Sequence, residues 1–368
     1  MRAVFWWSAV MILYVYVGYP VLLALWAKLV GERRAIRGAS PTRPAVSIVL
    51  AARNEADRLP ARLDNLLSLE YPAADRQIIV ISDGSTDRTA EVLASYGSRI
   101  DVVILPPRGK AAALNAGVAR ARHDILVFAD ARQTFAANAL LALTAPFADP
   151  NVGGVTGELV LGCESTGGRR HGTDRRATNR AGSPDRRGHL ASAIAEGVGV
   201  YWRYEKTIRR LESAVGSTLG ATGAIYAMRR SLWRPLPEEA LLDDVLAPMR
   251  VVLAGQRVIF DEQATAFDYT SRDSSAETRR KIRTLAGNVQ ILWLEPRLLV
   301  PIVNPVWIQY FSHKVGRLLV PYALLALLAA NIALVQQHLF FMMALAAQCA
   351  LYLLAGYGAW IEQRAVHA

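Results

Sequence analysis

Cysteine is almost absent from this chain: two of its 368 residues, Cys163 and Cys349, are cysteines. They form neither a metal-binding spacing nor a disulfide framework, which suits a reducing compartment. No Gly-x-Gly-x-x-Gly segment follows the first apolar strand, so a dinucleotide-dependent oxidoreductase is disfavoured. The chain also lacks a nucleic-acid recognition module, and we predict no nucleic-acid partner in spite of a net charge of +11.

Large apolar side chains are nearly missing from residues 164–189, which contain seven arginines and many small or polar residues. This composition predicts a flexible basic loop. Two roles stay open for the loop: a solvated insertion next to anionic lipid headgroups, or a guide for a polyanionic ligand.

Hydrophobic residues, by contrast, make up 52% of the chain and gather in long runs. The runs begin near residues 3, 318 and 339, and each can cross about 30 Å of hydrocarbon as a helix. The first run is longer than the apolar core of a signal peptide and lacks a small-residue cleavage site, so we predict that it stays uncleaved. We therefore predict transmembrane helices over residues 1–30, 318–335 and 339–361.

Basic residues flank these runs on the sides that lead to the central part of the chain. They are Lys28, Arg33, Arg34 and Arg37 after the first run, and His313, Lys314 and Arg317 before the second. By the positive-inside tendency, we predict a multi-pass protein of the plasma (inner) membrane with a cytoplasmic central part. Residues 31–44 are then a cytoplasmic linker. Residues 296–317 are largely apolar but too short to span, and they predict an interfacial amphipathic helix.

Three apolar segments of the central part each end in a polar loop that carries a carboxylate. Residues 46–50, 77–82 and 124–129 lead into Glu55, Asp83 and Asp130, respectively. The repeated order of strand, loop and helix predicts an α/β domain over residues 45–295. Ligands bind at the carboxyl ends of the strands in an open parallel sheet, so these carboxylates mark the expected site.

Four motifs follow one another along this domain: Asp83-Gly84-Ser85, Lys110-Ala111-Ala112-Ala113-Leu114-Asn115, Asp130-Ala131-Arg132 and Asp243-Asp244. In this order and spacing the chain resembles the membrane-bound family 2 glycosyltransferases of the cellulose synthase and hyaluronan synthase type. The resemblance covers about residues 45 to 295. It implies a GT-A fold, with a Rossmann-like and mostly parallel sheet, beside membrane helices. It also implies transfer of a sugar from a nucleotide-diphosphate donor, with inversion at the anomeric carbon.

The resemblance assigns donor binding to the first half of the domain. Ala51, Asn54 and Glu55 form the loop after the first strand, and Asp83 ends the second strand, where its carboxylate can accept hydrogen bonds from a base or a ribose. The alternative for Asp83 and its neighbours is a turn that caps the next helix. Lys110 opens a further helix, and the resemblance implies that it binds the donor too.

Asp130-Ala131-Arg132 stands where the family has its Asp-x-Asp metal motif. Asp130 is then the predicted ligand of a Mg²⁺ or Mn²⁺ ion that bridges the diphosphate oxygens. The second carboxylate is absent, because Arg132 takes its place. Either Asp130 still holds a metal with help from the phosphates, or Arg132 replaces part of the metal's charge through a bidentate phosphate contact.

The resemblance places the acceptor end later in the chain. The segment with Thr222 and Gly223 resembles the family's acceptor-lining stretch, where small residues let a sugar approach the backbone. Asp243 and Asp244 match its acidic pair. We predict Asp244 as the base that deprotonates the incoming hydroxyl, with Asp243 as its neighbour or a helix cap.

Arg280 and Arg283 lie where processive members carry Gln-x-x-Arg-Trp, and they share one face of a predicted helix. They are predicted to bind the diphosphate, and lipid contact is the alternative. Thr284 replaces the expected tryptophan, which puts processive synthesis in doubt.

Taken together, the sequence predicts an inverting glycosyltransferase of polysaccharide or cell-envelope glycan synthesis. Its predicted partners are a nucleotide-sugar donor, a saccharide or lipid-linked acceptor, and the lipid bilayer. A UDP-sugar is the favoured donor. A polyprenyl-phosphate glycosyltransferase and a catalytically degenerate membrane scaffold are the alternatives. Three membrane helices are few for a translocation pore, so export of a product would need a partner or an oligomer.

Overall fold

The computed structural model describes residues 1–30, 43–162, 186–269 and 274–366. Most of the predicted linker and of the predicted basic loop lies outside these residues, as does Cys163. The loop boundary predicted at residue 189 is wrong, because residues 186–189 already belong to a long helix, α7 (Arg186–Val215).

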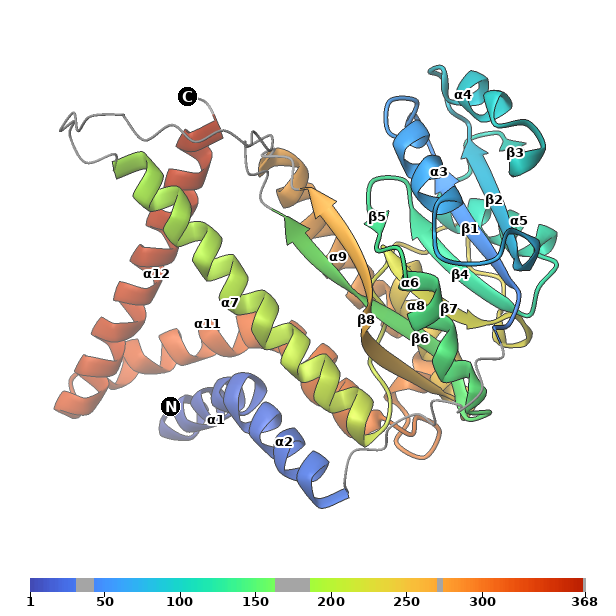
Figure 1. Ribbon diagram of the computed structural model, residues 1–368. Helices are drawn as coiled ribbons and strands as arrows, with labels where there is room; N and C mark the ends of the chain where they lie inside the picture. Colours follow the sequence, from blue (N-terminus) through green and yellow to red (C-terminus); the bar gives the residue numbers. More distant parts are fainter. Residues whose placement is uncertain (31–42, 163–185, 270–273, 367–368) are drawn as a thin grey trace, which may run out of the picture.

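A twisted sheet forms the centre of the α/β domain (Figure 1). Within the described residues it has eight strands in the order β3-β2-β1-β4-β7-β6-β8-β5. The pairs β1–β2, β2–β3, β1–β4 and β6–β8 are parallel, whereas β7 and β5 run antiparallel to their neighbours. The strands are β1 (Val46–Ala52), β2 (Arg76–Asp83), β3 (Asp101–Leu105), β4 (Ile125–Asp130), β5 (Thr134–Phe135), β6 (Val152–Gly162), β7 (Ile225–Arg229) and β8 (Arg257–Tyr269). The predicted α/β class with a mostly parallel sheet is confirmed.

Helices cover both faces of this sheet. Side chains alternate along β1, so Ile48 and Leu50 enter one core while Val49 enters the other. The first core is closed by α3 (Leu59–Leu67) and α6 (Ala139–Thr144). The second is closed by α5 (Lys110–Arg120) and α8 (Asp243–Leu253). The apolar run that starts β1 is therefore buried on both sides, as central parallel strands are.

The register of the sheet brings the predicted site residues to one edge. Ala51 of β1 pairs with Asp130 of β4, and Ala52 pairs with Ser82, which precedes Asp83 in β2. The carboxyl ends of these parallel strands therefore meet, and the loops that follow them lie next to one another. The short helix α4 (Thr89–Ser95) continues from the β2 loop.

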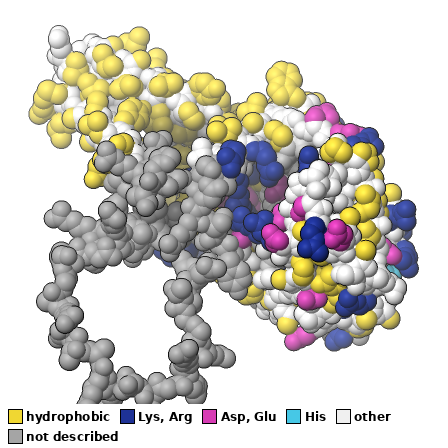
Figure 2. All heavy atoms as spheres, turned by 90° about the horizontal axis from the view of Figure 1, so that it is seen from above, with side chains coloured by type: hydrophobic (Ala, Val, Ile, Leu, Met, Phe, Trp, Pro, Cys, Tyr) yellow, Lys and Arg dark blue, Asp and Glu magenta, His cyan; other side chains and the backbone are white. Residues whose placement is uncertain are grey.

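Three helical segments among the described residues are long and apolar enough to cross a membrane: Arg2–Val30, Trp307–Leu334 and Leu339–Gly358. They are built from α1 (Arg2–Leu13) with α2 (Tyr19–Val30), α10 (Trp307–Gln309) with α11 (Gly316–Leu334), and α12 (Leu339–Val366). Figure 2 shows hydrophobic side chains over this part of the molecule, whereas charged side chains gather on the α/β domain. The three apolar helices indicate association with a membrane.

The predicted interfacial helix over residues 296–317 is wrong. A short 3-10 turn (Pro296–Leu299) is followed by turns, and the next helix begins at Trp307 and runs into the membrane segment. Pro301 and Pro305 supply no backbone N–H, so a regular helix is disfavoured there. The Asn304 side chain donates a hydrogen bond to Leu298 O at 2.8 Å. The second apolar helix therefore starts eleven residues before the predicted residue 318.

Two further helices connect the α/β domain to the membrane helices. α7 packs along α2 through a cluster of Tyr19, Leu23, Ile208 and Val215. α9 (Ser274–Leu294) follows β8 and leads to the 3-10 turn before the second membrane segment. The catalytic candidates on the sheet edge are thereby held next to the membrane helices (Figure 1).

Candidate active site

Lys110 lies at the centre of the candidate site. Its Nζ is 3.1 Å from Asp130 Oδ1 and 3.2 Å from Asp243 Oδ2. Lys110 is the first residue of α5, and Gly109 before it has φ +94°, a backbone conformation that favours glycine. The lysine therefore joins the end of β4 to the start of α8, two positions more than a hundred residues apart in the chain.

Asp243 and Asp244 occupy the first turn of α8, where negative charge is favoured by the helix dipole. Pro248 lies inside this helix and has no N–H to donate to the carbonyl four residues earlier, which is that of Asp244. The freed Asp244 carbonyl accepts a hydrogen bond from Ala221 N at 2.7 Å. A proline thus ties the small-residue loop before β7 to the acidic pair.

Gly223 lies against the Asp244 carboxylate. A Cβ at residue 223 would be 2.8 Å from Asp244 Oδ2, so any side chain there would push the carboxylate away. The neighbouring Thr222 is fixed by bonds from its N to Thr156 Oγ1 (2.8 Å) and from its Oγ1 to Gly157 O (2.9 Å). The structure therefore brings the predicted acceptor segment and the predicted base together.

The surroundings of Asp244 raise its pKa above that of an ordinary aspartate. Burial, together with the like charges of Asp243 and Asp130, raises the pKa of Asp244 to about 6, although Lys110 opposes the shift. Burial alone would lower the pKa of Lys110, but the surrounding carboxylates outweigh it and raise that pKa. Asp243 is 5% exposed, and Lys110 is its ion-pair partner.

Tyr226 is a site residue that the sequence analysis missed. Its hydroxyl is buried, and the residues that the structure describes offer it no hydrogen-bond partner. Burial, followed by the negative charges of Asp243, Asp244 and Asp130, raises the pKa of this phenol. The ring stacks on Phe128, its pairing partner in β4, with centroids 4.6 Å apart. Its position, three residues after Gly223, was the available signal.

The predicted donor residues Asp83 and Asn54 lie in two loops that are pinned together. Asp83 is 4% exposed and accepts hydrogen bonds from Arg108 N (2.7 Å) and Gly109 N (3.1 and 3.0 Å). Asn54, with φ +55°, accepts from Thr86 N at 2.8 Å. Asp83 thus fixes the turn that presents Lys110, while its role towards a donor stays a prediction.

Gly84 allows this turn to form. Its φ is +61°, and a Cβ there would be 2.5 Å from Pro107 N. Beside it, the predicted donor residue Ala51 is partly buried in the sheet. Glu55, the other residue predicted in this loop, forms an ion pair with Arg58 at 2.8 Å.

Arg132 is paired with a buried carboxylate. Its guanidinium makes a bidentate contact with Asp268, which is fully buried and also accepts from Gln133 Nε2 at 3.0 Å. Asp268 already takes a bidentate contact from the Arg132 guanidinium, so the phosphate contact predicted for Arg132 would have to form in addition to this ion pair. Another missed residue, Arg62, is 1% exposed and donates to the Asp130 carbonyl at 3.0 Å, which fixes the end of β4.

Arg280 and Arg283 are exposed on α9. The helix confirms that they share a face. Further along α9, a Cβ at Gly287 would be 2.5 Å from Leu242 Cγ, and Gln290 accepts from Leu241 N at 2.9 Å. α9 therefore packs on the residues just before Asp243, and diphosphate binding by its arginines stays a prediction.

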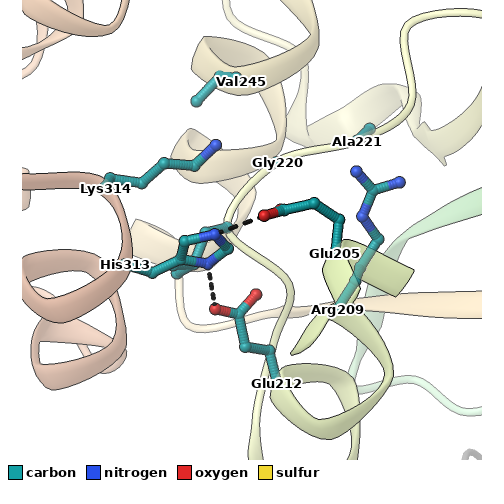
Figure 3. A pocket seen from close by; sticks show the side chains of 9 residues that line it. Glu205, Arg209, Glu212, Gly220, Ala221, Val245, His313 and Lys314 are labelled. Carbon is teal, nitrogen blue, oxygen red and sulfur yellow. Dashed lines mark hydrogen bonds and ion pairs between the residues drawn. The ribbon is translucent and has the colours of Figure 1, made fainter. Parts of the chain in front are cut away.

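A cavity of about 50 Å³ adjoins the acidic pair (Figure 3). It is lined by Glu205, Arg209 and Glu212 of α7, by Leu219, Gly220 and Ala221 of the small-residue loop, by Val245 of α8, and by His313 and Lys314 of the second membrane segment. His313 lies between the two glutamates, 2.7 Å from Glu212 Oε1 and 3.5 Å from Glu205 Oε2. The sequence analysis used His313 and Lys314 only as flanking charges.

Residues 47–232, about half of the chain, match the family described as Glycosyl transferase family 2. The chain belongs to that family. This glycosyltransferase is 36% identical to a poly-beta-1,6-N-acetyl-D-glucosamine synthase of Staphylococcus epidermidis over 116 residues, 30% of this chain and 28% of the relative. The synthase of Staphylococcus aureus strain MSSA476 is 32% identical over 156 residues, 38% of this chain and 37% of the relative. The matched segments thus span well under half of these relatives.

A solved structure resembles the glycosyltransferase over nearly its whole length. The mannosyltransferase PcManGT from Pyrobaculum calidifontis, in complex with GDP-Man and Mn²⁺, matches with a TM-score of 0.70 and 22% identity. The match covers 98% of this chain and 95% of that one. The predicted GT-A fold is confirmed. The chain is a family 2 glycosyltransferase, and nucleotide sugars are the donors of this family.

The oxygen atoms of the Asp130 carboxylate are of the type that binds a hard divalent cation, but one carboxylate supplies too few ligands by itself. The Asp130 side chain is 35% exposed and can be reached by a ligand. Within the described ranges there is no group of three or more His, Cys, Asp and Glu side chains that could hold a metal ion. An ion at Asp130 would therefore take its remaining oxygen ligands from the donor's phosphates and from water.

Proposed function

We propose that this enzyme transfers a sugar from a nucleotide-diphosphate donor to a hydroxyl of a saccharide or lipid-linked acceptor, with inversion. The observation that supports it is the contact of Lys110 with both Asp130 and Asp243, next to Asp244. This contact joins the donor half of the domain to the acceptor half. A UDP-sugar is the first candidate donor, and polysaccharide or cell-envelope glycan synthesis is the proposed setting.

In the proposed reaction the acceptor oxygen forms a bond to the anomeric carbon while the bond from that carbon to the diphosphate oxygen breaks. Asp244 takes the proton of the attacking hydroxyl, and the nucleoside diphosphate leaves with the electron pair. A pKa of about 6 suits this role, because Asp244 is then mostly deprotonated at neutral pH and still basic enough to accept a proton.

Lys110 and Asp130 act on the donor side. The Lys110 ammonium bridges the carboxylates of Asp130 and Asp243 and offers positive charge towards the diphosphate. Asp130 would hold a Mg²⁺ or Mn²⁺ ion, which supplies charge neutralisation to the leaving diphosphate when bound. Asp83 supports the turn in front of Lys110 and is proposed to contact the nucleoside.

The proposed location is the cytoplasmic face of the plasma membrane. Lys28 lies in the last turn of the first apolar helix, and Lys314 and Arg317 lie in the first three turns of the second, on the side of the α/β domain. Such charges favour the cytoplasmic side. The sugar nucleotide would then be taken from the cytosol.

The full chain in detergent, incubated with a panel of UDP-, GDP- and dTDP-sugars, tests the proposal through the nucleotide that is released. We expect release from one class of donor, loss of release with EDTA, and recovery with Mg²⁺ or Mn²⁺. No release from any donor, with either metal and with short oligosaccharides as acceptors, would contradict the proposed reaction. Full release in EDTA would contradict the metal at Asp130 alone.

A further inference from the structure

The cavity beside the acidic pair has the size of a small polar group. A buried water needs about 10–15 Å³ of such volume, so 50 Å³ accommodates a group the size of a phosphate. Ala221 and Val245 line it, and these residues flank Asp244: Val245 follows it, and Ala221 N is bonded to its carbonyl. A group in this cavity therefore lies one residue away from the proposed base.

The two carboxylates that line the cavity already have polar partners. Glu205 is bonded to Arg317 and lies 3.5 Å from His313, and burial is outweighed by these two partners, which lower its pKa to about 2. Glu212 accepts from Tyr19 at 2.8 Å and lies 2.7 Å from His313. Neither glutamate is paired with Arg209 or Lys314.

Two cations in the same lining have no carboxylate partner among the described residues. Arg209 donates to the neutral Thr222 hydroxyl at 2.6 Å and lies over the Phe260 ring. For Lys314 Nζ the described part of the chain offers no hydrogen-bond or ion-pair partner. Figure 3 shows the Lys314 amino group directed towards Gly220 and Val245, and the Arg209 guanidinium next to Ala221. Unpaired charges of this kind are costly to bury unless a ligand neutralises them.

We propose that Lys314 and Arg209 form a binding site for a phosphate group on the acceptor. A phosphate offers several oxygens and negative charge, so it can bond both cations at once, whereas a sugar hydroxyl brings no charge to them. The site rests on the proposed function, because it places the phosphate next to the hydroxyl that Asp244 deprotonates. It assigns the acceptor to hydroxyl-bearing phosphate esters.

The phosphate is carried by a lipid. Lys314 belongs to the membrane segment Trp307–Leu334, close to the end that faces the α/β domain. The first apolar helix reaches the same cluster through Tyr19, which bonds Glu212. A phosphate held there lies at the depth of lipid headgroups, so its acyl or prenyl chain can stay in the bilayer.

Equilibrium binding of decyl phosphate to the full chain in a neutral detergent tests this site, with decyl β-D-glucoside as the uncharged comparison. We expect decyl phosphate to bind, Lys314→Gln to weaken its binding at least tenfold, and Lys314→Arg to retain most of it. Lys28→Gln is the matched control, because Lys28 is an exposed lysine at the end of another membrane helix. It should leave binding unchanged.

Inorganic phosphate as a competitor separates the two sources of the anion. Weak competition supports a lipid-borne phosphate, whereas competition as strong as that of decyl phosphate supports the anion site but assigns it to a soluble phosphate. Equal binding of the wild type and Lys314→Gln, at the same thermal midpoint, would overturn the site, as would a wild type that does not bind decyl phosphate.

This measurement needs no turnover. A chain that binds decyl phosphate through Lys314 but releases nucleotide from no donor would overturn the proposed transfer and leave the anion site standing. Release of nucleotide without any contribution of Lys314 to decyl phosphate binding would overturn the anion site and leave the proposed transfer standing.

Discussion

At the scale of single residues, the site depends on one lysine shared by two carboxylates. Lys110 balances the charges of Asp130 and Asp243, and Asp244 lies in the same cluster. Burial and the like charges of Asp243 and Asp130 raise the pKa of Asp244 to about 6. Asp244 can therefore accept a proton near neutral pH.

The pH dependence of transfer follows from this arrangement. The pKa of Asp244 is raised to about 6, and only its deprotonated form can accept the hydroxyl proton. We therefore expect kcat to be constant above pH 7 and to fall about tenfold per pH unit well below 6. The measurement is steady-state nucleotide release between pH 4.5 and 8.5, at saturating donor. A rate that stays flat from pH 7 to 5 would contradict the assignment.

Much of this residue set could be predicted from sequence. Asp130, Lys110, Asp243 and Asp244 converge because strand ends and helix starts of an α/β domain meet at one sheet edge. Asp268 could not be found in this way, and for Tyr226 the only signal was its position just after the small-residue segment. A phenol and a carboxylate acquire their roles from burial next to charges, which a sequence motif does not report.

At the scale of secondary-structure elements, the loop before β7 and the start of α8 form one unit. Pro248 leaves the Asp244 carbonyl free for Ala221 N, and Gly223 leaves room for the Asp244 carboxylate. The position of Asp244, the proposed base, is therefore set by residues that carry no charge.

Gly223→Ala tests this coupling. The new Cβ would lie 2.8 Å from Asp244 Oδ2, so the carboxylate has to move, and we expect the rate of transfer to fall at least tenfold with little change in donor affinity. Gly216→Ala is the matched control, because its Cβ would meet only ordinary contacts, 3.7 Å or more away. Similar rates for the two variants would show that Gly223 does not position the base.

The elements themselves were predicted with uneven success. The strands that begin at Val46, Arg76 and Ile125 agree with their apolar runs to within a few residues. The stretch before the second membrane helix failed, since its apolar composition suggested a helix that Pro301 and Pro305 prevent. An apolar composition is compatible with a helix, but it does not show that the prolines leave the helix without two of its backbone N–H donors.

At the scale of the whole molecule, one buried network joins the α/β domain to two membrane helices. Glu212 of α7 is 1% exposed, accepts from Tyr19 of α2 and lies 2.7 Å from His313. Residues from three distant parts of the chain thus share one carboxylate. Their convergence could not be predicted, because each appeared in the sequence as an ordinary polar residue near an apolar run.

Glu212→Ala should loosen this connection. It leaves Tyr19 and His313 without their buried partner, at a cost of about 1–3 kcal/mol for each unsatisfied group. We expect the thermal midpoint in detergent to drop by several degrees. Glu91→Ala, which removes an exposed ion pair with Arg88, is the control and should have almost no effect. Equal midpoints for the two variants would contradict the structural role of the network.

The central claim is that Asp244 is the base of a site whose donor half is formed by other residues. Measuring single-turnover transfer and donor affinity on the same preparation of Asp244→Asn tests it most directly. The substitution keeps the size of the side chain and removes its basicity, so we predict that transfer is abolished while the donor Kd stays within a few-fold of the wild type. Transfer at the wild-type rate would contradict the claim.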